Sequence, residues 1–471
     1  MDIKILVIGI VIIVTLVKPL LLSKDSSWKS YSQGTTGLLN PIIAILSIFA
    51  SLGGGFMVFG IVQMGFEGGL TGYIFGLAYL IGMPLLIIVV NKTNGSSSHD
   101  KNGMFGLDGL LFRKYGKGTL LCFYLLSGIV FSGVLGGQFL ALKYFLSIYS
   151  DSFNLTLILT IGLVGTILYT ILFGFRGVIT NDIIQALLEL SVAIIFPIYL
   201  YNFLSSNTNH VVDLSKETIS GEYSILYALL GSFFLLLSFS TRADLWQRIN
   251  KVDKKYQKIV IIASTLLLVY YYFMMSSSGI AIKQNLDLLN IENLDARSLT
   301  VIISEKLVEN QFFLIVCLSG ILIAVFSSID SYLNLSSLSL TRLMLWKSVR
   351  IGEDENLSDI EKNKLIVNAR IVTLVTSIIA GVFALTVPDI TDLLSASFSI
   401  LGILLPIVLM AIFRKEKMTD KSGYVPMLVS LIILLLTLPF LRKIAFVPSI
   451  IVGTILFFIL LRSKRPSDLE S

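Results

Sequence analysis

Long apolar runs, each about twenty residues long and separated by polar stretches, recur along the whole chain. A helix needs about 20 consecutive apolar residues to cross the hydrocarbon core of a bilayer. The pattern predicts about thirteen such helices, which together take up more than half of the chain. We expect them at residues 3–22, 40–64, 68–90, 117–149, 154–175, 177–202, 222–241, 258–282, 309–341, 367–387, 389–413, 424–441 and 444–462. This pattern excludes a soluble enzyme with one membrane anchor.

The composition agrees with a membrane protein. Of the 471 residues, 55% are hydrophobic and 14% are charged, and the mean hydropathy is +0.86. Soluble domains carry about 25% charged residues. Lysine and arginine gather in cytoplasmic loops, and with the N-terminus outside, roughly 27 of the 36 basic residues fall in loops assigned to the cytoplasm. We therefore expect a multi-pass protein of the inner membrane, with its C-terminus in the cytoplasm.

The predicted helices form four groups along the chain. Residues 1–35 hold an extra N-terminal transmembrane helix, 36–205 and 206–415 hold five helices each, and 416–471 hold two C-terminal helices and a short tail. The first helix of the first set contains Ser51-Leu52-Gly53-Gly54-Gly55. Glycines are poor helix formers, so we expect a break there. Broken helices near the membrane centre are typical of inverted-repeat transporters, although glycines also permit close helix packing.

A polar stripe follows the second half of the predicted helix 309–341. Ala324, Ser327, Ser328 and Ser331 have the spacing i, i+3, i+4 and i+7, so they share one helix face. Serine hydroxyls also bond back to their own helix, which would account for two or three of these residues. Two hydroxyls combined with carbonyls of the broken helix would form an oxygen cage of low charge, which suits Na⁺.

Three carboxylates are predicted inside the membrane. Asp330 borders the serine stripe, and Asp182 precedes Glu189 by seven residues on helix 177–202. A charge at the bilayer centre costs about 2.5–3.5 kcal/mol, so Asp330 and Asp182 need partners. No basic residue lies in the middle of a core helix, so we expect a cation or a proton unless a loop supplies a counter-ion. Alternatively, Asp182 caps its helix, and Glu189 is a protonated carboxyl bonded to a neighbouring helix.

Four stretches together resemble the solute:sodium symporter family. They are Ala50-Ser51-Leu52-Gly53 with Gly60 downstream, the segment from Gly174 to Gln185, Gln247-Arg248 before a basic loop, and Ala-x-x-Ser-Ser at Ala324, Ser327 and Ser328. The resemblance covers roughly residues 35–415. It implies an all-α integral membrane fold with a five-plus-five inverted-repeat core of the LeuT type, one extra N-terminal helix and two extra C-terminal helices.

The resemblance also implies where Na⁺ binds. The principal sodium site would use the carbonyls of Ala50, Gly53 and Ala324 and the hydroxyls of Ser327 and Ser328. Some members have a second sodium site, whose candidates here are Asp182, Ser327, Asp330 and Ser331. Asp330 stands where those members tend to have a hydroxyl. It would either tighten binding of the second ion or make the site proton-linked.

The same resemblance places the solute beside the helix breaks. The candidate solute-binding residues are Gly54, Met57, Ser132, Gln138, Ser238, Phe239, Ser395 and Ser397. They offer hydroxyls and an amide but no arginine, the residue that usually recognises carboxylates. A neutral or zwitterionic solute is therefore favoured. Arg242 and Asp244, at the inner end of the sixth core helix, are either an inner gate or solvated surface charges.

The predicted function is Na⁺-coupled secondary active import of a small polar solute, such as a sugar or an amino acid, by alternating access. The alternatives are a proton-coupled carrier on the same fold and import of an anionic solute such as sialic acid. No enzyme is expected, because the sequence has no nucleophile–base pair, metal motif or phosphate loop. The expected partners are the solute, Na⁺ and the bilayer, with no nucleic acid, no organic cofactor and no transition metal. A monomer would suffice for transport, and the oligomeric state stays open.

Overall fold

The computed structural model of the chain describes residues 3–21, 27–34, 38–94, 106–148, 153–207, 225–289, 296–347, 357–387, 389–441 and 444–462. Within these residues the protein contains helices and no β-strand, which confirms the predicted all-α membrane fold. Each of the thirteen predicted segments coincides with a helix. In the described residues, ten helices are long and apolar enough to cross a membrane, or eleven with one bent pair, so the count of thirteen is not confirmed.

Eleven of the predicted segments are continuous helices. They are α1 (Ile3–Leu20), α5 (Thr71–Asn94), α7 (Lys117–Ile148), α8 (Phe153–Phe173), α9 (Phe175–Asn207), α12 (Gln257–Gln284), α15 (Gln311–Met344), α16 (Asp359–Thr386), α17 (Ile390–Phe413), α18 (Asp420–Leu441) and α19 (Phe446–Arg462). Two of these helices, α1 and α19, are shorter than the ten long spans, and the apolar part of α1 covers Gly9–Pro19.

The other two predicted segments are broken. One consists of α3 (Pro41–Gly55), the π-helical turn η1 (Phe56–Gly60) and α4 (Ile61–Gly68); the other consists of α10 (Ile225–Ser238), the 3₁₀ turn η4 (Phe239–Thr241) and α11 (Ala243–Ile249). Short connecting helices are α2 (Trp28–Gln33), α6 (Leu107–Lys114), α13 (Leu286–Leu289), η5 (Ala296–Ser298) and α14 (Leu299–Leu307).

Local sequence signals explain where the central helices begin. Asn40 caps α3, because its side chain accepts a hydrogen bond from the Ile42 amide, and Pro41 takes the first helical position. Asn310 caps α15 in the same way. Ser358 and Glu361 form a capping box at the start of α16. These caps satisfy backbone amides that the helices themselves leave unpaired.

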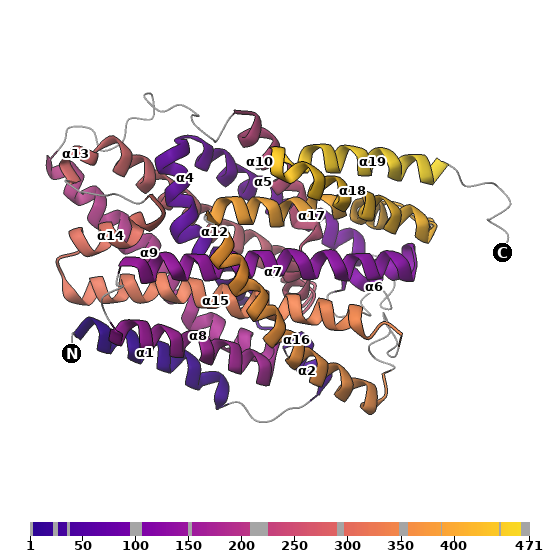
Figure 1. Cartoon of the computed structure of the whole chain (residues 1–471), viewed down its shortest axis with the longest axis horizontal. Helices are drawn as coiled ribbons and strands as arrows, with labels where there is room; N and C mark the ends of the chain where they lie inside the picture. The colour runs from indigo at the N-terminus through magenta and orange to yellow at the C-terminus, as the bar shows by residue number, and fades with distance from the viewer. Residues whose placement is uncertain are drawn as a thin grey trace.

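The helix α15 forms the centre of the molecule. In its most apolar stretch 83% of the residues are buried, compared with 22% in α18. It packs against α3, α7, α9 and α16. In Figure 1, α7 and α15 run side by side through the middle, α1 and α8 lie together on one flank, and α18 and α19 lie on the opposite flank. The polar stripe of α15, from Ser327 to Ser331, is therefore surrounded by protein and not by lipid.

Candidate functional site

The helix α3 breaks at Gly54. Its backbone has φ +53° and ψ −178°, a conformation that is essentially restricted to glycine. A Cβ atom at this position would lie 2.1 Å from the Ser328 hydroxyl. The amide of Gly55 leaves the helix and donates to Gln138 Oε1 at 2.9 Å. The predicted break is therefore present, and it directs the free end of α3 at α15.

The serines of α15 meet the carbonyl end of α3. Ser327 Oγ lies 3.0 Å from the Ala50 carbonyl oxygen and 2.9 Å from the Ala324 carbonyl oxygen. Ser328 Oγ lies 3.4 Å from the Ser51 carbonyl oxygen. Ser327 thus contacts both Ala50 and Ala324, and these are three of the predicted ligands of the principal sodium site. Ser328 and Gly53 flank them on the two facing helices.

The donor chemistry of this cluster fits a small monovalent cation. Its ligating atoms are carbonyl and hydroxyl oxygens, the hard ligands that alkali and alkaline-earth ions prefer. The carbonyls of α3 belong to the C-terminal end of a half-helix, where the helix dipole is negative. The Ser327 hydroxyl already lies within hydrogen-bond distance of the Ala50 and Ala324 carbonyl oxygens, as neighbouring ligands of one ion do. Ala50, Ala324, Ser327, Ser328 and Gly53 are the residues that would hold Na⁺.

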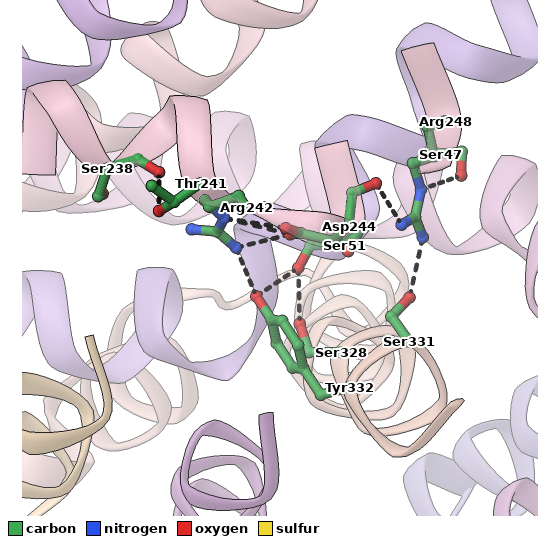
Figure 2. A network of polar contacts seen from close by, with 10 residues as sticks. All are labelled: Ser47, Ser51, Ser238, Thr241, Arg242, Asp244, Arg248, Ser328, Ser331 and Tyr332. Carbon is green, nitrogen blue, oxygen red and sulfur yellow. Dashed lines mark hydrogen bonds and ion pairs between the residues drawn. The ribbon is translucent and has the colours of Figure 1, made fainter. Parts of the chain in front are cut away.

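A buried arginine joins the candidates for the second sodium site. Arg248 of α11 donates from Nε to Ser47 Oγ at 2.7 Å and from Nη2 to Ser331 Oγ at 3.1 Å. Its Nη2 lies 3.7 Å from Asp182 Oδ2, and Ser47 also donates to this carboxylate. Figure 2 shows the guanidinium between Ser47 and Ser331. Asp182 therefore has a basic counter-ion from outside the predicted spans, the exception that the sequence analysis left open, and α11 supplies it.

Asp330 has partners of a different kind. Tyr169 of α8 donates its hydroxyl to Asp330 Oδ2, and Gln185 Nε2 lies 3.5 Å from the same oxygen. Both Asp330 and Asp182 are fully buried. The structure thus places Asp182, Asp330 and Ser331 in neighbouring positions between α9 and α15, with Arg248 between Asp182 and Ser331.

Arg242 and Asp244 are a buried ion pair and not solvated surface charges. Each side chain is 1% exposed, and Arg242 Nη2 lies 2.7 Å from Asp244 Oδ2. Arg242 Nη2 also donates to the Tyr332 hydroxyl at 3.3 Å, and Tyr332 donates to the Ser51 carbonyl at 2.9 Å. Figure 2 shows this chain of contacts running from the α10–α11 break to the end of α3. The two helix breaks are therefore linked through Tyr332.

A cavity is lined by residues that follow the α3 break in the chain, whereas Arg248 binds Ser47, which precedes the break. Its lining comes from η1, α4, α5, α10, α12, α17 and α19, and contains Phe56, Met64, Phe75, Tyr79, Tyr227, Gly231, Phe234, Leu235, Ser238, Tyr272, Leu394, Ser395, Phe398, Ser399, Gly402, Phe446 and Ile450. Eight of these residues are aromatic, and none is charged. Tyr227 and Ser395 form a hydrogen bond at 3.1 Å on its wall. The cavity therefore offers ring faces and hydroxyl groups.

Only Ser238 and Ser395, of the eight predicted solute residues, line this cavity. The others are packed elsewhere: Gly54 and Gln138 at the helix break, Ser132 against Gly128 and Ser336, Ser397 against Gly133, Met57 within the core, and Phe239 against Tyr79. The structure does not gather the eight residues around one space. Phe239 still touches the cavity wall through its ring contact with Tyr79.

Comparison with known proteins agrees with this geometry. A sequence model of the sodium:solute symporter family matches residues 35–429. The chain belongs to this family. It is therefore a multi-pass membrane transporter and not an enzyme, and Na⁺ is its coupling ion. A search of curated protein sequences finds no match to this symporter.

Solved structures share the fold of the symporter. A Na⁺-coupled sialic acid symporter in a substrate-bound, outward-open state aligns over 99% of both chains, with a TM-score of 0.72 and 18% sequence identity. A nucleobase-cation-symport-1 family transporter in a closed conformation with bromovinylhydantoin bound aligns over 94% of this chain and 95% of that chain, with a TM-score of 0.50 and 15% identity. Both are LeuT-fold transporters, and the likeness shows the fold.

Sequence reasoning missed several residues of the candidate site. Arg248 was noticed only as part of a motif, and the break at Arg242 was not predicted because no glycine or proline marks it. The signal was the apolar spacing of Leu245, Trp246 and Ile249 after the expected end of the span, which indicates one more buried helical turn. Tyr332 and Tyr169 gave no signal, because a tyrosine in an apolar helix usually packs like phenylalanine.

Proposed function

We propose that this symporter imports a small, polar, neutral or zwitterionic organic solute together with Na⁺ by alternating access. The observation that carries the proposal is the position of Ser327 Oγ, which lies within 3.0 Å of the Ala50 carbonyl and 2.9 Å of the Ala324 carbonyl. An ion bound there would hold α3 against α15. Because the ion binds more tightly when the two helices are together, it shifts the population toward that state.

The distribution of basic residues supports an orientation with the N-terminus outside and the C-terminus in the cytoplasm of a cell with an inner membrane. In this orientation α3 starts at the cytoplasmic side, and the cavity beside Phe56 and Met64 faces outward. The pairs of Arg248 with Asp182 and of Arg242 with Asp244 then fill the cytoplasmic side. These buried pairs support a conformation that is closed to the cytoplasm.

The two sets of five helices, 36–205 and 206–415, are proposed as inverted repeats. Each set begins with a broken helix, α3 with α4 in the first and α10 with α11 in the second. The second pair is bent by 45°. Paired broken helices at equivalent positions are typical of transporters in which the repeats rock around a central site.

The cavity lining favours an uncharged solute. The sialic acid transported by the structural relative is an anion, and carboxylates are usually held by arginine or lysine. No lining residue of this cavity is charged. Its aromatic faces and the hydroxyls of Ser238, Ser395 and Ser399 instead suit the apolar and hydroxyl-bearing faces of a sugar or a similar molecule.

One Na⁺ at the helix break is the stoichiometry that we propose for this conformation. Arg248 already neutralises Asp182 and binds Ser331, two candidates for a second ion. A cation placed beside them would be repelled by the guanidinium. The proton-coupled alternative is tested by the same experiment as the Na⁺ requirement.

The test uses the purified protein in liposomes. A thermal-shift screen of sugars, amino acids, vitamins and sialic acid, with and without Na⁺, first identifies a solute, because bound ligands stabilise by mass action. Uptake of that solute is then measured with an inward Na⁺ gradient, with K⁺ in place of Na⁺, and with a pH gradient alone. We expect uptake with Na⁺ only. Uptake that persists in K⁺ would overturn the proposal, and uptake driven by the pH gradient alone would assign proton coupling.

A further inference from the structure

Glu189 is a buried carboxylate that the predicted sodium site does not use. It lies in the middle of α9 and has no exposed surface. Within the described residues, neither of its carboxylate oxygens has a hydrogen-bond partner. An ionisable side chain at membrane depth without a partner is costly, and it is a candidate for function by default.

The carboxylate of Glu189 points at the break in α3. A Cβ atom added to Gly53 would lie 1.6 Å from Oε1 and 2.6 Å from Cδ of Glu189. The Glu189 carboxylate therefore occupies space that is free only because Gly53 has no side chain. The carboxylate also faces the Gly54 amide without meeting the geometry of a hydrogen bond. Gly53 is a predicted ligand of the principal sodium site, so Glu189 stands at the edge of that site.

The helix α15 approaches Glu189 from the other side. A Cβ atom at Gly320 would lie 2.3 Å from the carbonyl oxygen of Leu188, the neighbour of Glu189. Gly320 precedes Ala324 by one helical turn, so the two share a face of α15. Tyr271 of α12 completes the surroundings: it interacts electrostatically with Glu189, and its buried hydroxyl has no partner among the described residues. Along α9 itself, the nearest interacting charge is Asp182.

We infer that Glu189 is a carboxylate ligand of the Na⁺ at the helix break, which extends the principal site from neutral oxygens to one formal negative charge. The C-terminal end of α3 carries the negative end of its helix dipole, and a carboxylate beside it is repelled unless a cation lies between them. Glu189 reaches the end of α3 at Gly53, and the Ser327 hydroxyl of α15 reaches the same end at the Ala50 carbonyl. This inference rests on the proposed Na⁺-coupled function.

The test measures the Na⁺ concentration for half-maximal thermal stabilisation and for half-maximal uptake in Glu189→Gln, Glu189→Asp and the parent protein. We expect Glu189→Gln to raise both values by about 10–100-fold, the loss typical when a metal site is weakened, with the solute KM at saturating Na⁺ unchanged. Glu189→Asp should give a smaller rise, because the charge stays but the reach is shorter. Asp108→Asn is the matched control, since Asp108 is also buried but binds Tyr124 far from α3 along the sequence.

Gly53→Ala supplies an independent test that keeps the carboxylate and the Gly53 carbonyl. Its methyl group would displace Glu189, so it should raise the Na⁺ requirement on its own and add little in the double variant with Glu189→Gln. If Glu189→Gln fails to fold, Gly53→Ala alone decides the question, and parent-like Na⁺ affinity in Gly53→Ala would overturn the inference. Parent-like Na⁺ affinity in Glu189→Gln, or additive effects in the double variant, would overturn the inference. A parent protein that ignores Na⁺ would instead overturn the proposed function.

Discussion

Arg248 and Asp182 form an ion pair in which Nη2 and Oδ2 are 3.7 Å apart and the side chains are 1% and 0% exposed. The pair joins α11 to α9, and the bonds of Arg248 to Ser47 and Ser331 add α3 and α15. Four helices therefore meet at one guanidinium on one side of the α3 break. In the proposed orientation these contacts lie on the cytoplasmic side, and the proposed alternating-access cycle requires them to separate before that side opens.

The first prediction concerns the stability of this ion pair. Arg248→Met leaves Asp182 buried without its counter-ion. We expect the free energy of unfolding to fall by about 3–5 kcal/mol, because a single buried charge without a counter-ion destabilises the folded protein. Asp182→Asn in the Arg248→Met background should recover part of that loss, with a coupling energy of about 0.5–3 kcal/mol. The measurement is the unfolding midpoint of the two single variants and the double variant in detergent. Strictly additive losses would show that the two side chains do not interact.

The second prediction separates the two serines of α15. Ser327 lies between the Ala50 and Ala324 carbonyls, whereas Ser328 approaches only the Ser51 carbonyl, at 3.4 Å. Ser327→Ala should raise the Na⁺ concentration for half-maximal uptake by about tenfold, the equivalent of one lost hydrogen-bond-like contact, and Ser328→Ala should raise it less. Uptake at saturating Na⁺ measures whether each variant still folds. A larger effect at Ser328 would contradict the placement of the ion.

Much of this fold could be predicted from the sequence, because the bilayer imposes one strong rule. Every backbone group at membrane depth needs an internal partner, so apolar runs become helices and three adjacent glycines mark a break. The residues also indicated that the polar face of α15 and the freed carbonyls would meet, whereas the pairing of Ser327 with Ala50 came from the family resemblance. Both features are local sequence patterns, and polar groups in them that lack a partner at membrane depth destabilise the folded protein.

The sequence could not predict contacts made by residues beyond the expected end of a span. Arg248 lies beyond residue 241, the expected end of its span, yet α11 continues after a 45° bend and carries Arg248 to Asp182. No propensity rule marks a bend at Ser240-Thr241-Arg242, so only tertiary packing determines it. The partner of Asp330 was missed for the same reason, because Tyr169 reaches it from another helix.

The third prediction concerns the backbone at Gly54. Gly54→Ala forces a side chain into a conformation that costs about 1–3 kcal/mol and places its methyl group 2.1 Å from Ser328 Oγ. We expect a lower unfolding temperature and loss of Na⁺-induced stabilisation. Gly381→Ala is the matched control: no atom lies within 4 Å of its added Cβ, so it should be neutral or stabilise α16 by about 0.5–1 kcal/mol. Equal behaviour of the two variants would show that the break has no structural role.

The last prediction tests the cavity independently of the ion. Ser395 lies on the cavity wall and bonds to Tyr227, so Ser395→Trp should fill the space with an indole ring. We expect solute uptake and solute-induced stabilisation to disappear while Na⁺-induced stabilisation stays. The reason is that Ala50 and Ser327 of the ion cluster lie on α3 and α15, whereas Ser395 lies on α17. Ser395→Ala removes the same hydroxyl without filling the cavity and should retain uptake with a modest rise in KM. If Ser395→Trp transports normally, the solute binds elsewhere. If Ser395→Trp loses Na⁺-induced stabilisation as well as uptake, the cavity and the ion site share one wall. Solute binding would then depend directly on the position of α3.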